Sequence, residues 1–166
     1  MSVSNVSTWV IISIVVLFLL LIPGIDHGLW GPDEPRVAGI CAGMARTNDY
    51  IVPHLNGKPF LEKPPLYYAV AAVSGSLLSV GGDVPYRLVS LLFAVLTIIA
   101  ACAIASHRDG VVTGIIAGGI LASSVGFFML SRQVQVDIAL VFGVVLAMYA
   151  YLEAVDSSSA KYSIVL

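Results

Sequence analysis

Residues 88–106 read LVSLLFAVLTIIAACAIAS, a run without a single charged side chain. At about 1.5 Å of rise per residue, a helix of this length crosses the hydrocarbon core of a bilayer. Three further stretches also lack charge, namely residues 1–25, 110–131 and 138–152. Backbone exposed to lipid must satisfy its own hydrogen bonds, so each stretch should be α-helical. The pattern predicts an all-α, polytopic integral membrane protein.

The composition supports the same class. Hydrophobic residues make up 58% of the chain and charged residues 11%, against about 25% charged residues in ordinary soluble domains. The mean hydropathy is +0.97. A water-soluble domain of 166 residues could not bury so much apolar surface, so membrane lipids are expected partners. The net charge of −2 gives no reason to expect a nucleic-acid partner.

About four transmembrane helices are predicted, at about residues 7–22, 84–106, 111–130 and 134–152. The first lacks the basic region and cleavage site of a secretory signal, so we expect a retained span. The last three are joined by very short connections and should be antiparallel neighbours. The chain stops just as another apolar segment begins, so we expect residues 1–166 to be the N-terminal part of a truncated transmembrane domain.

The predicted outer loop, residues 23–83, is the chemically richest part of the chain. Eleven of the 18 charged residues fall between Asp26 and Arg87. Helical spacing of apolar residues predicts a short helix at about 35–46, and prolines with Asn-Gly predict turns after it. Residues 64–80 contain enough glycine and serine to weaken the interpretation as a membrane span. Two alternatives remain for this segment: a helix that spans the membrane, or a helix that lies at its surface.

Two charged clusters lie in this loop. Asp33 and Glu34 are adjacent at the start of the predicted helix, where the helix dipole favours negative charge. They could simply cap the helix, or supply a general base or a metal ligand. Glu62 and Lys63 precede two prolines. They could form a weak surface ion pair, or Lys63 could meet an anion and Glu62 a metal or a hydroxyl.

A third cluster, Arg132 with Asp137, flanks the start of the last predicted span. Asp137 is expected about one turn inside an apolar helix. Charges in such positions are costly and are usually functional or paired. The aromatic residues of the loop are interpreted as interfacial anchors rather than sugar-stacking platforms; they are Trp30, Tyr50, Tyr67 and Tyr68.

Three motifs together resemble a known family. They are DEPR at 33–36, DYIVPHLNG at 49–57 and EKPPL at 62–66. Their order and spacing resemble the first periplasmic loop of the bacterial aminoarabinose transferases. That family is related to the dolichyl-phosphate-mannose protein mannosyltransferases, and both are GT-C glycosyltransferases.

The resemblance implies a membrane glycosyltransferase that moves a sugar from a polyprenyl-phosphate donor to a lipid, glycan or protein acceptor. It implies that Asp33 lies at the catalytic centre, where it could serve as the base for an acceptor hydroxyl, and that Glu62 helps to hold a divalent metal ion. Further residues are expected to contact substrate or phosphate. Those further residues are Arg36, Lys63, Glu34, Arg132 and Asp137. It also implies a multi-pass protein of the bacterial inner membrane with the loop on the periplasmic side. Chains of the family are several times longer, so this fragment alone is expected to be inactive.

The third cluster bears on the open question about residues 64–80. If that segment spans the membrane, Arg132 and Asp137 emerge on the side opposite Asp33; if it is interfacial, all three share one side. We predict the interfacial arrangement. The positive-inside rule would place the loop in the cytoplasm, but long loops follow it poorly, so the resemblance is preferred. The alternative functions are a transporter fragment and a noncatalytic membrane subunit.

Overall fold

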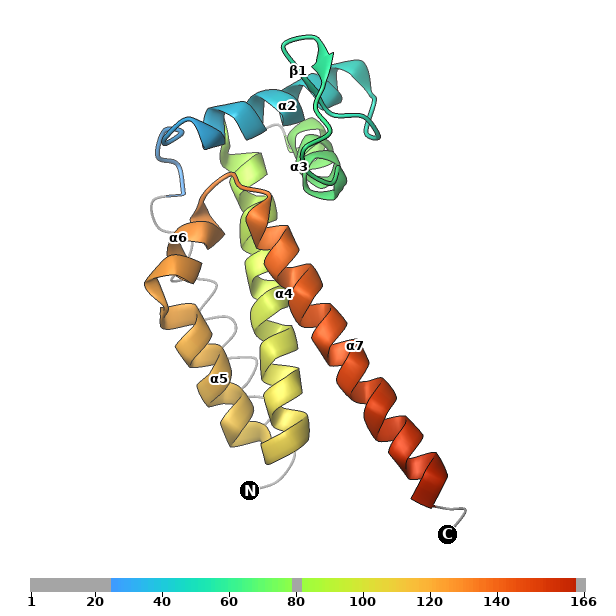
Figure 1. Cartoon of the computed structure of the whole chain (residues 1–166). Helices are drawn as coiled ribbons and strands as arrows, with labels where there is room; N and C mark the ends of the chain where they lie inside the picture. Colours follow the sequence, from blue (N-terminus) through green and yellow to red (C-terminus); the bar gives the residue numbers. More distant parts are fainter. Residues whose placement is uncertain (1–24, 79–81, 164–166) are drawn as a thin grey trace.

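The computed structural model describes residues 25–78 and 82–163, with side chains described up to Val155. The predicted first span, residues 7–22, lies outside the described residues. The described part has two regions. Long helices run away from one end of the molecule, and two shorter helices with a small hairpin lie across that end (Figure 1).

The long helices form the membrane part. Helices α4 (Val84–Asp109) and α7 (Asp137–Ser163) are each long and apolar enough to cross a membrane. Helices α5 (Val111–Ser123) and α6 (Val125–Arg132) pass the same test as a pair. The described residues therefore contain two spans, or three if the bent pair counts as one. Helix α4 packs against α5, α6 and α7 and is the centre of the bundle.

The span predicted as one helix at 111–130 is broken. Helices α5 and α6 meet at an angle of 69°, and Ser124 between them has an extended backbone (φ −69°, ψ 127°). Sharp kinks occur at serine and glycine residues, and a serine hydroxyl can compete for backbone hydrogen bonds. The Ser123 hydroxyl donates to the Ile120 carbonyl, 3.1 Å away, at this point. In the sequence, the adjacent Ser123 and Ser124 within an apolar run could have indicated this break.

Helix α7 begins at Asp137, three residues after the predicted start at 134. Gln133 has an extended backbone (φ −94°, ψ 150°), and the Val134 amide donates to a carboxylate of another segment instead of to its own helix. Asp137 consequently stands in the first turn of α7, not one turn inside it. Negative charge is favourable there because of the helix dipole.

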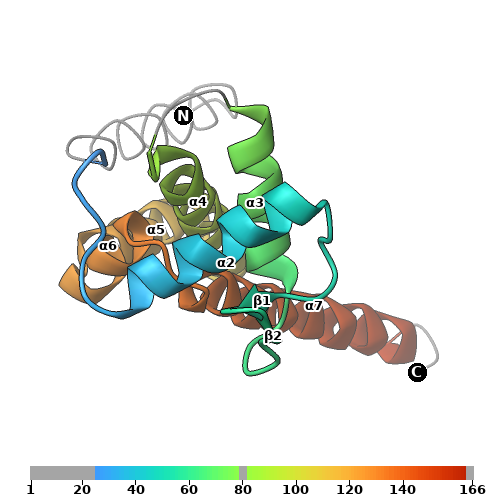
Figure 2. The ribbon, with the colours of Figure 1, turned by 90° about the horizontal axis from the view of Figure 1, so that it is seen from above.

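The loop forms two helices that lie across the end of the bundle. Helix α2 (Asp33–Thr47) ends at Asn48, which adopts the left-handed conformation (φ 54°). Helix α3 (Leu66–Leu77) follows the two prolines. Seen from above, α2 passes over α3 and over the near ends of the long helices (Figure 2). Neither α2 nor α3 is long enough to be counted as a span.

A two-stranded hairpin joins α2 to α3. Strands β1 (His54–Leu55) and β2 (Lys58–Pro59) pair antiparallel. Asn56 and Gly57 both have positive φ, at 52° and 76°. This is the backbone of a two-residue turn that Asn-Gly sequences favour. The hairpin turns the chain back, so Phe60 lies beside the first turn of α2, with its ring centre 5.8 Å from the Arg36 guanidinium.

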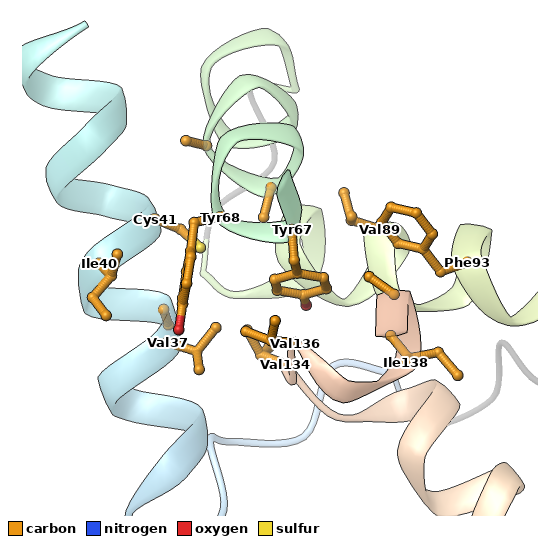
Figure 3. Packing of buried hydrophobic residues seen from close by; sticks show 14 of the residues in the cluster. Val37, Ile40, Cys41, Tyr67, Tyr68, Val89, Phe93, Val134, Val136 and Ile138 are labelled. Carbon is orange, nitrogen blue, oxygen red and sulfur yellow. The ribbon is translucent and has the colours of Figure 1, made fainter. Parts of the chain in front are cut away.

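The core lies where the two regions meet (Figure 3). Tyr67 and Tyr68 are buried there, with exposed fractions of 0% and 1%. Tyr68 faces Ile40 and Cys41 of α2, and Tyr67 lies near Phe93 of α4. The interpretation of these two tyrosines as interfacial anchors was wrong, because their rings fill the space between the helices. Trp30, by contrast, is 70% exposed.

Small residues let α4 and α5 approach closely. A β-carbon at Gly114 would collide with the Ser106 hydroxyl and lie 2.7 Å from the backbone oxygen of Cys102. A β-carbon at Gly118 would collide with the Cys102 sulfur. A β-carbon at Gly119 meets nothing within 4 Å. Close helix contact at small residues is the usual way that helices associate in a membrane.

The replacement Gly114→Ala should destabilise the protein by about 1–3 kcal/mol, because a backbone oxygen cannot move aside and overpacking strains the helix pair. Gly119→Ala is the matched control on the same helix and should be neutral or stabilising. Unfolding of both variants in detergent would be followed by circular dichroism. Equal stability of the two variants would contradict the packing described here.

Candidate functional site

Four of the predicted site residues line one small pocket at the end of the bundle. Asp33 and Arg36 come from the first turn of α2, Lys63 from the segment before α3, and Asp137 from the start of α7. The pocket holds about 50 Å³. Residues separated by about a hundred positions in the sequence therefore meet, as the interfacial arrangement of residues 64–80 requires.

The charges of the pocket form two ion pairs. Lys63 Nζ lies 2.6 Å from Asp137 Oδ1, and Arg36 donates to Asp33 Oδ1 over 2.7 Å. The four side chains are 43–53% exposed. Exposed pairs of this kind are weak, and their partners can be exchanged at small cost. An anion entering the pocket could therefore take over Lys63 or Arg36.

An apolar and aromatic floor supports the charges. Phe60 lies below Arg36, with the guanidinium 5.8 Å from the ring centre, and its ring meets Tyr68 edge to face at 6.2 Å. Tyr68 also lines the pocket. Burial raises the pKa of the Tyr68 hydroxyl to about 12, further above neutral pH than the ordinary value of a phenol.

Glu34 does not reach this pocket. Its side chain is 1% exposed and accepts hydrogen bonds from the Trp30 amide at 2.5 Å and the Val134 amide at 2.7 Å. It also pairs with Arg87 at 3.1 Å. A group this enclosed is not available to a substrate, which differs from the contact role expected for Glu34. Glu34 follows Asp33 directly in the sequence, but the two side chains point in different directions, because adjacent residues of a helix are about 100° apart around its axis.

Arg87 is the residue that the sequence reasoning missed. Its side chain is fully buried and donates to the Arg132 carbonyl at 2.7 Å and to the His27 carbonyl at 3.0 Å. Its Nη1 lies 3.0 Å from His27 Nε2; a guanidinium only donates, so that ring nitrogen accepts. The sequence did contain one indication of this role: Arg87 is a charged residue at the start of a long apolar run, where a charge needs partners.

Two other predicted residues lie away from the pocket lining. The Arg132 guanidinium stands 5.0 Å from the centre of the Phe128 ring, a cation–π contact. Glu62 is exposed. Within residues 25–78 and 82–163, no three His, Cys, Asp or Glu side chains converge to hold a metal ion. These residues do not by themselves form a metal site, and Glu62 as a metal ligand stays a prediction.

A larger cavity of about 610 Å³ lies between the C-terminal half of α2 and the hairpin. Arg46, Asp49 and His54 are among its lining residues. The Asp49 carboxylate accepts hydrogen bonds from the amides of Ile51 and Val52, and these lower its pKa. None of the residues expected to act on a substrate lines this cavity, so the smaller pocket is the candidate site.

The ion pair between Lys63 and Asp137 should contribute little to stability. In a double-mutant cycle with Lys63→Ala and Asp137→Ala, the coupling energy should stay below about 1 kcal/mol because both groups are about half exposed. Unfolding of the four proteins in detergent would give this value. A coupling energy well above that limit would mean that the pair has a structural role.

The sequence model of the dolichyl-phosphate-mannose-protein mannosyltransferase family matches residues 62–166, more than half of the chain. Curated relatives include two proteins of Pseudomonas aeruginosa named undecaprenyl phosphate-α-4-amino-4-deoxy-L-arabinose arabinosyl transferase. One is 37% identical over 70 residues, which cover 42% of this chain and 13% of the relative. The other is 30% identical over 146 residues, which cover 85% of this chain and 26% of the relative.

The fold has a counterpart among solved structures. The crystal structure of ArnT from Cupriavidus metallidurans bound to undecaprenyl phosphate matches with a TM-score of 0.78 and 24% identity, covering 86% of this chain and 26% of that one. Its apo form matches with a TM-score of 0.76. The chain thus spans about a quarter or less of the length of these relatives. With the family match over most of its length and the shared membrane fold, the chain belongs to the dolichyl-phosphate-mannose-protein mannosyltransferase family of GT-C membrane proteins.

Proposed function

We propose that this chain forms the first part of a membrane glycosyltransferase that transfers a sugar from a polyprenyl-phosphate donor to a lipid or glycan acceptor. The observation that carries the proposal is the pocket in which Asp33, Arg36, Lys63 and Asp137 meet at the end of the helix bundle. The names of the relatives, which specify an undecaprenyl phosphate-linked sugar, support this class of donor.

The reaction joins an acceptor oxygen to the anomeric carbon of the sugar while the bond from that carbon to the phosphate oxygen breaks. The acceptor loses a proton, and the polyprenyl phosphate leaves with the bonding electrons. Asp33 is proposed to accept the proton. Lys63 and Arg36 are proposed to bind the phosphate, whose negative charge increases as the bond breaks. Their stabilising effect is larger beside a bilayer than in bulk water, because the dielectric constant is lower there.

The ion pairs in the pocket are compatible with a site that binds an anion, because the anion can replace the carboxylate partners of the two basic side chains. Lys63 and Arg36 are each held by a carboxylate at 2.6–2.7 Å. A phosphate would compete with Asp137 for Lys63 and with Asp33 for Arg36. Release of Asp33 from Arg36 would free a carboxylate oxygen for the acceptor proton. Phosphate binding and activation of the base would then be coupled. A divalent ion near Glu62 stays a prediction, and no step above depends on it.

Replacement of Asp33 by asparagine should lower the rate of sugar transfer by about 10²- to 10⁴-fold, the usual contribution of a general base. Transfer from a radiolabelled polyprenyl-phosphate sugar in membranes would measure it, with the protein expressed at its natural length. Asp109→Asn, an exposed aspartate at the far end of α4, is the control and should leave the rate unchanged. Full activity of Asp33→Asn would exclude Asp33 as the base.

The loop is proposed to lie on the periplasmic side of a bacterial inner membrane. Single cysteines at positions 33 and 132 should then react with a membrane-impermeant maleimide added outside spheroplasts, in a background without Cys41 and Cys102. A cysteine at position 108 should react only after the membrane is permeabilised, because Arg108 lies at the other end of α4. Labelling of positions 33 and 132 from opposite sides would contradict the arrangement.

A further inference from the structure

The first turns of α4 touch every segment that carries a charged residue of the pocket, although α4 itself contributes none. Arg87 and Ser90 are one helical turn apart and both fully buried. Residues at this spacing share one face of a helix. That face of α4 points to the junction between the membrane helices and the overlying loop. At this junction Arg87 and Ser90 make polar contacts.

Arg87 fixes the segment that leads to Asp33. Its guanidinium pairs with Glu34, the residue next to Asp33, and donates to the carbonyl oxygens of His27 and Gly28 at 3.0 and 3.2 Å. The start of α2 is therefore attached to α4 by an ion pair and by the chain before it.

The same two residues of α4 fix the segment that leads to Asp137. Arg87 donates to the Arg132 carbonyl at 2.7 Å, and the Ser90 hydroxyl donates to the Gln133 carbonyl at 2.6 Å. Glu34 completes the connection by accepting the Val134 amide at 2.7 Å. The extended connection before α7 is thereby held on the start of α2 as well as on α4.

Ser90 also fixes the helix that follows Lys63. The Tyr67 hydroxyl lies 2.7 Å from the Ser90 oxygen. Ser90 donates its hydrogen to Gln133, so the tyrosine hydroxyl is the donor in this bond, which is shorter than its contact of 3.3 Å with the Tyr86 carbonyl. Burial raises the pKa of the Tyr67 hydroxyl further above neutral pH. Lys63 stands four residues before Tyr67, across the two prolines that restrict its backbone.

We infer that Arg87 and Ser90 are positioning residues: with Glu34 and Tyr67 they hold the segments that carry Asp33, Lys63 and Asp137 at the distances that the proposed transfer needs. This inference rests on the proposed function of the pocket. The four residues, called here the polar anchor, act through the pocket residues and not on the substrate.

The test compares two buried hydroxyls of α4. Ser90→Ala removes a bond between segments, whereas Thr97→Val is the matched control, since the Thr97 hydroxyl donates only within its own helix, to the Phe93 carbonyl at 2.7 Å. Ser90→Ala should lower kcat for transfer by roughly 10- to 100-fold, as misplaced catalytic groups do. Thr97→Val should change kcat by less than about twofold, with kcat of both variants measured well below their melting temperatures.

A second measurement does not depend on transfer. In protein without Cys41 and Cys102, cysteines at positions 63 and 137 should be joined efficiently by a short bifunctional thiol reagent. Addition of Ser90→Ala or Tyr67→Phe should reduce the yield at least several-fold, and Thr97→Val should not. If transfer is absent in every protein, the proposed function fails while the cross-linking still decides the inference. Unchanged cross-linking with Ser90→Ala, or equal losses in Ser90→Ala and Thr97→Val, would overturn it.

Discussion

A buried ion pair between Glu34 and Arg87 connects the membrane helices to the loop above them. Both side chains are almost inaccessible, at 1% and 0% exposure. A charge in such a place is strongly unfavourable unless its hydrogen-bonding groups find partners. Here the partners are backbone groups of two further segments, so the cost of burying the charges enforces one arrangement of the chain. The remaining contacts of the junction are compatible with this arrangement and reinforce it.

The pocket has the opposite character. Its ion pairs are about half exposed; the pair of Lys63 with Asp137 joins the segment before α3 to α7, and the pair of Arg36 with Asp33 lies within α2. In the polar anchor, charge is buried and paired through Glu34 and the two terminal nitrogens of Arg87, while Arg87 Nε has no partner among the described residues; in the pocket, charge is accessible and its partners can be exchanged. A site that must accept and release a phosphate needs accessible charges with exchangeable partners, as in the pocket. The buried charges of the polar anchor provide a rigid support that keeps the pocket residues in place. The two kinds stand side by side at Asp33 and Glu34, which are neighbours in the chain.

The junction is held by apolar packing and by polar contacts together. Its core buries side chains such as Ile40, Tyr67 and Phe93, and the polar anchor adds directional contacts that favour one arrangement of the segments. Within the bilayer the apolar surface is already covered by lipid, so hydrogen bonds and close packing decide how the helices meet. The glycines of α5 against Cys102 and Ser106 provide the close packing within the membrane part, and the polar anchor provides the hydrogen bonds at its end.

The sequence by itself determined the fold class, the helical segments and the chemistry of the loop. Long uncharged runs can only be helices in lipid, and a stretch such as Pro64-Pro65 or Asn56-Gly57 restricts its own backbone, so these are local properties. The meeting of Asp33, Arg36, Lys63 and Asp137 was expected from a family resemblance and from the choice of an interfacial helix for residues 64–80. No local pattern contained it, because the contacts join segments up to about a hundred residues apart.

Only the tertiary structure decided which charges face the pocket and which are buried. Asp33 and Glu34 have similar side chains and the same neighbours in sequence, and the phase of the helix separates them. The bend at Ser124, the late start of α7 and the burial of Tyr67 likewise depend on what packs nearby. Arg87 lies at the edge of an apolar run, and its role depends on carbonyl oxygens of residues 27, 28 and 132. A sequence specifies which groups require partners, but the partners of a buried charge are set by the three-dimensional path of the chain.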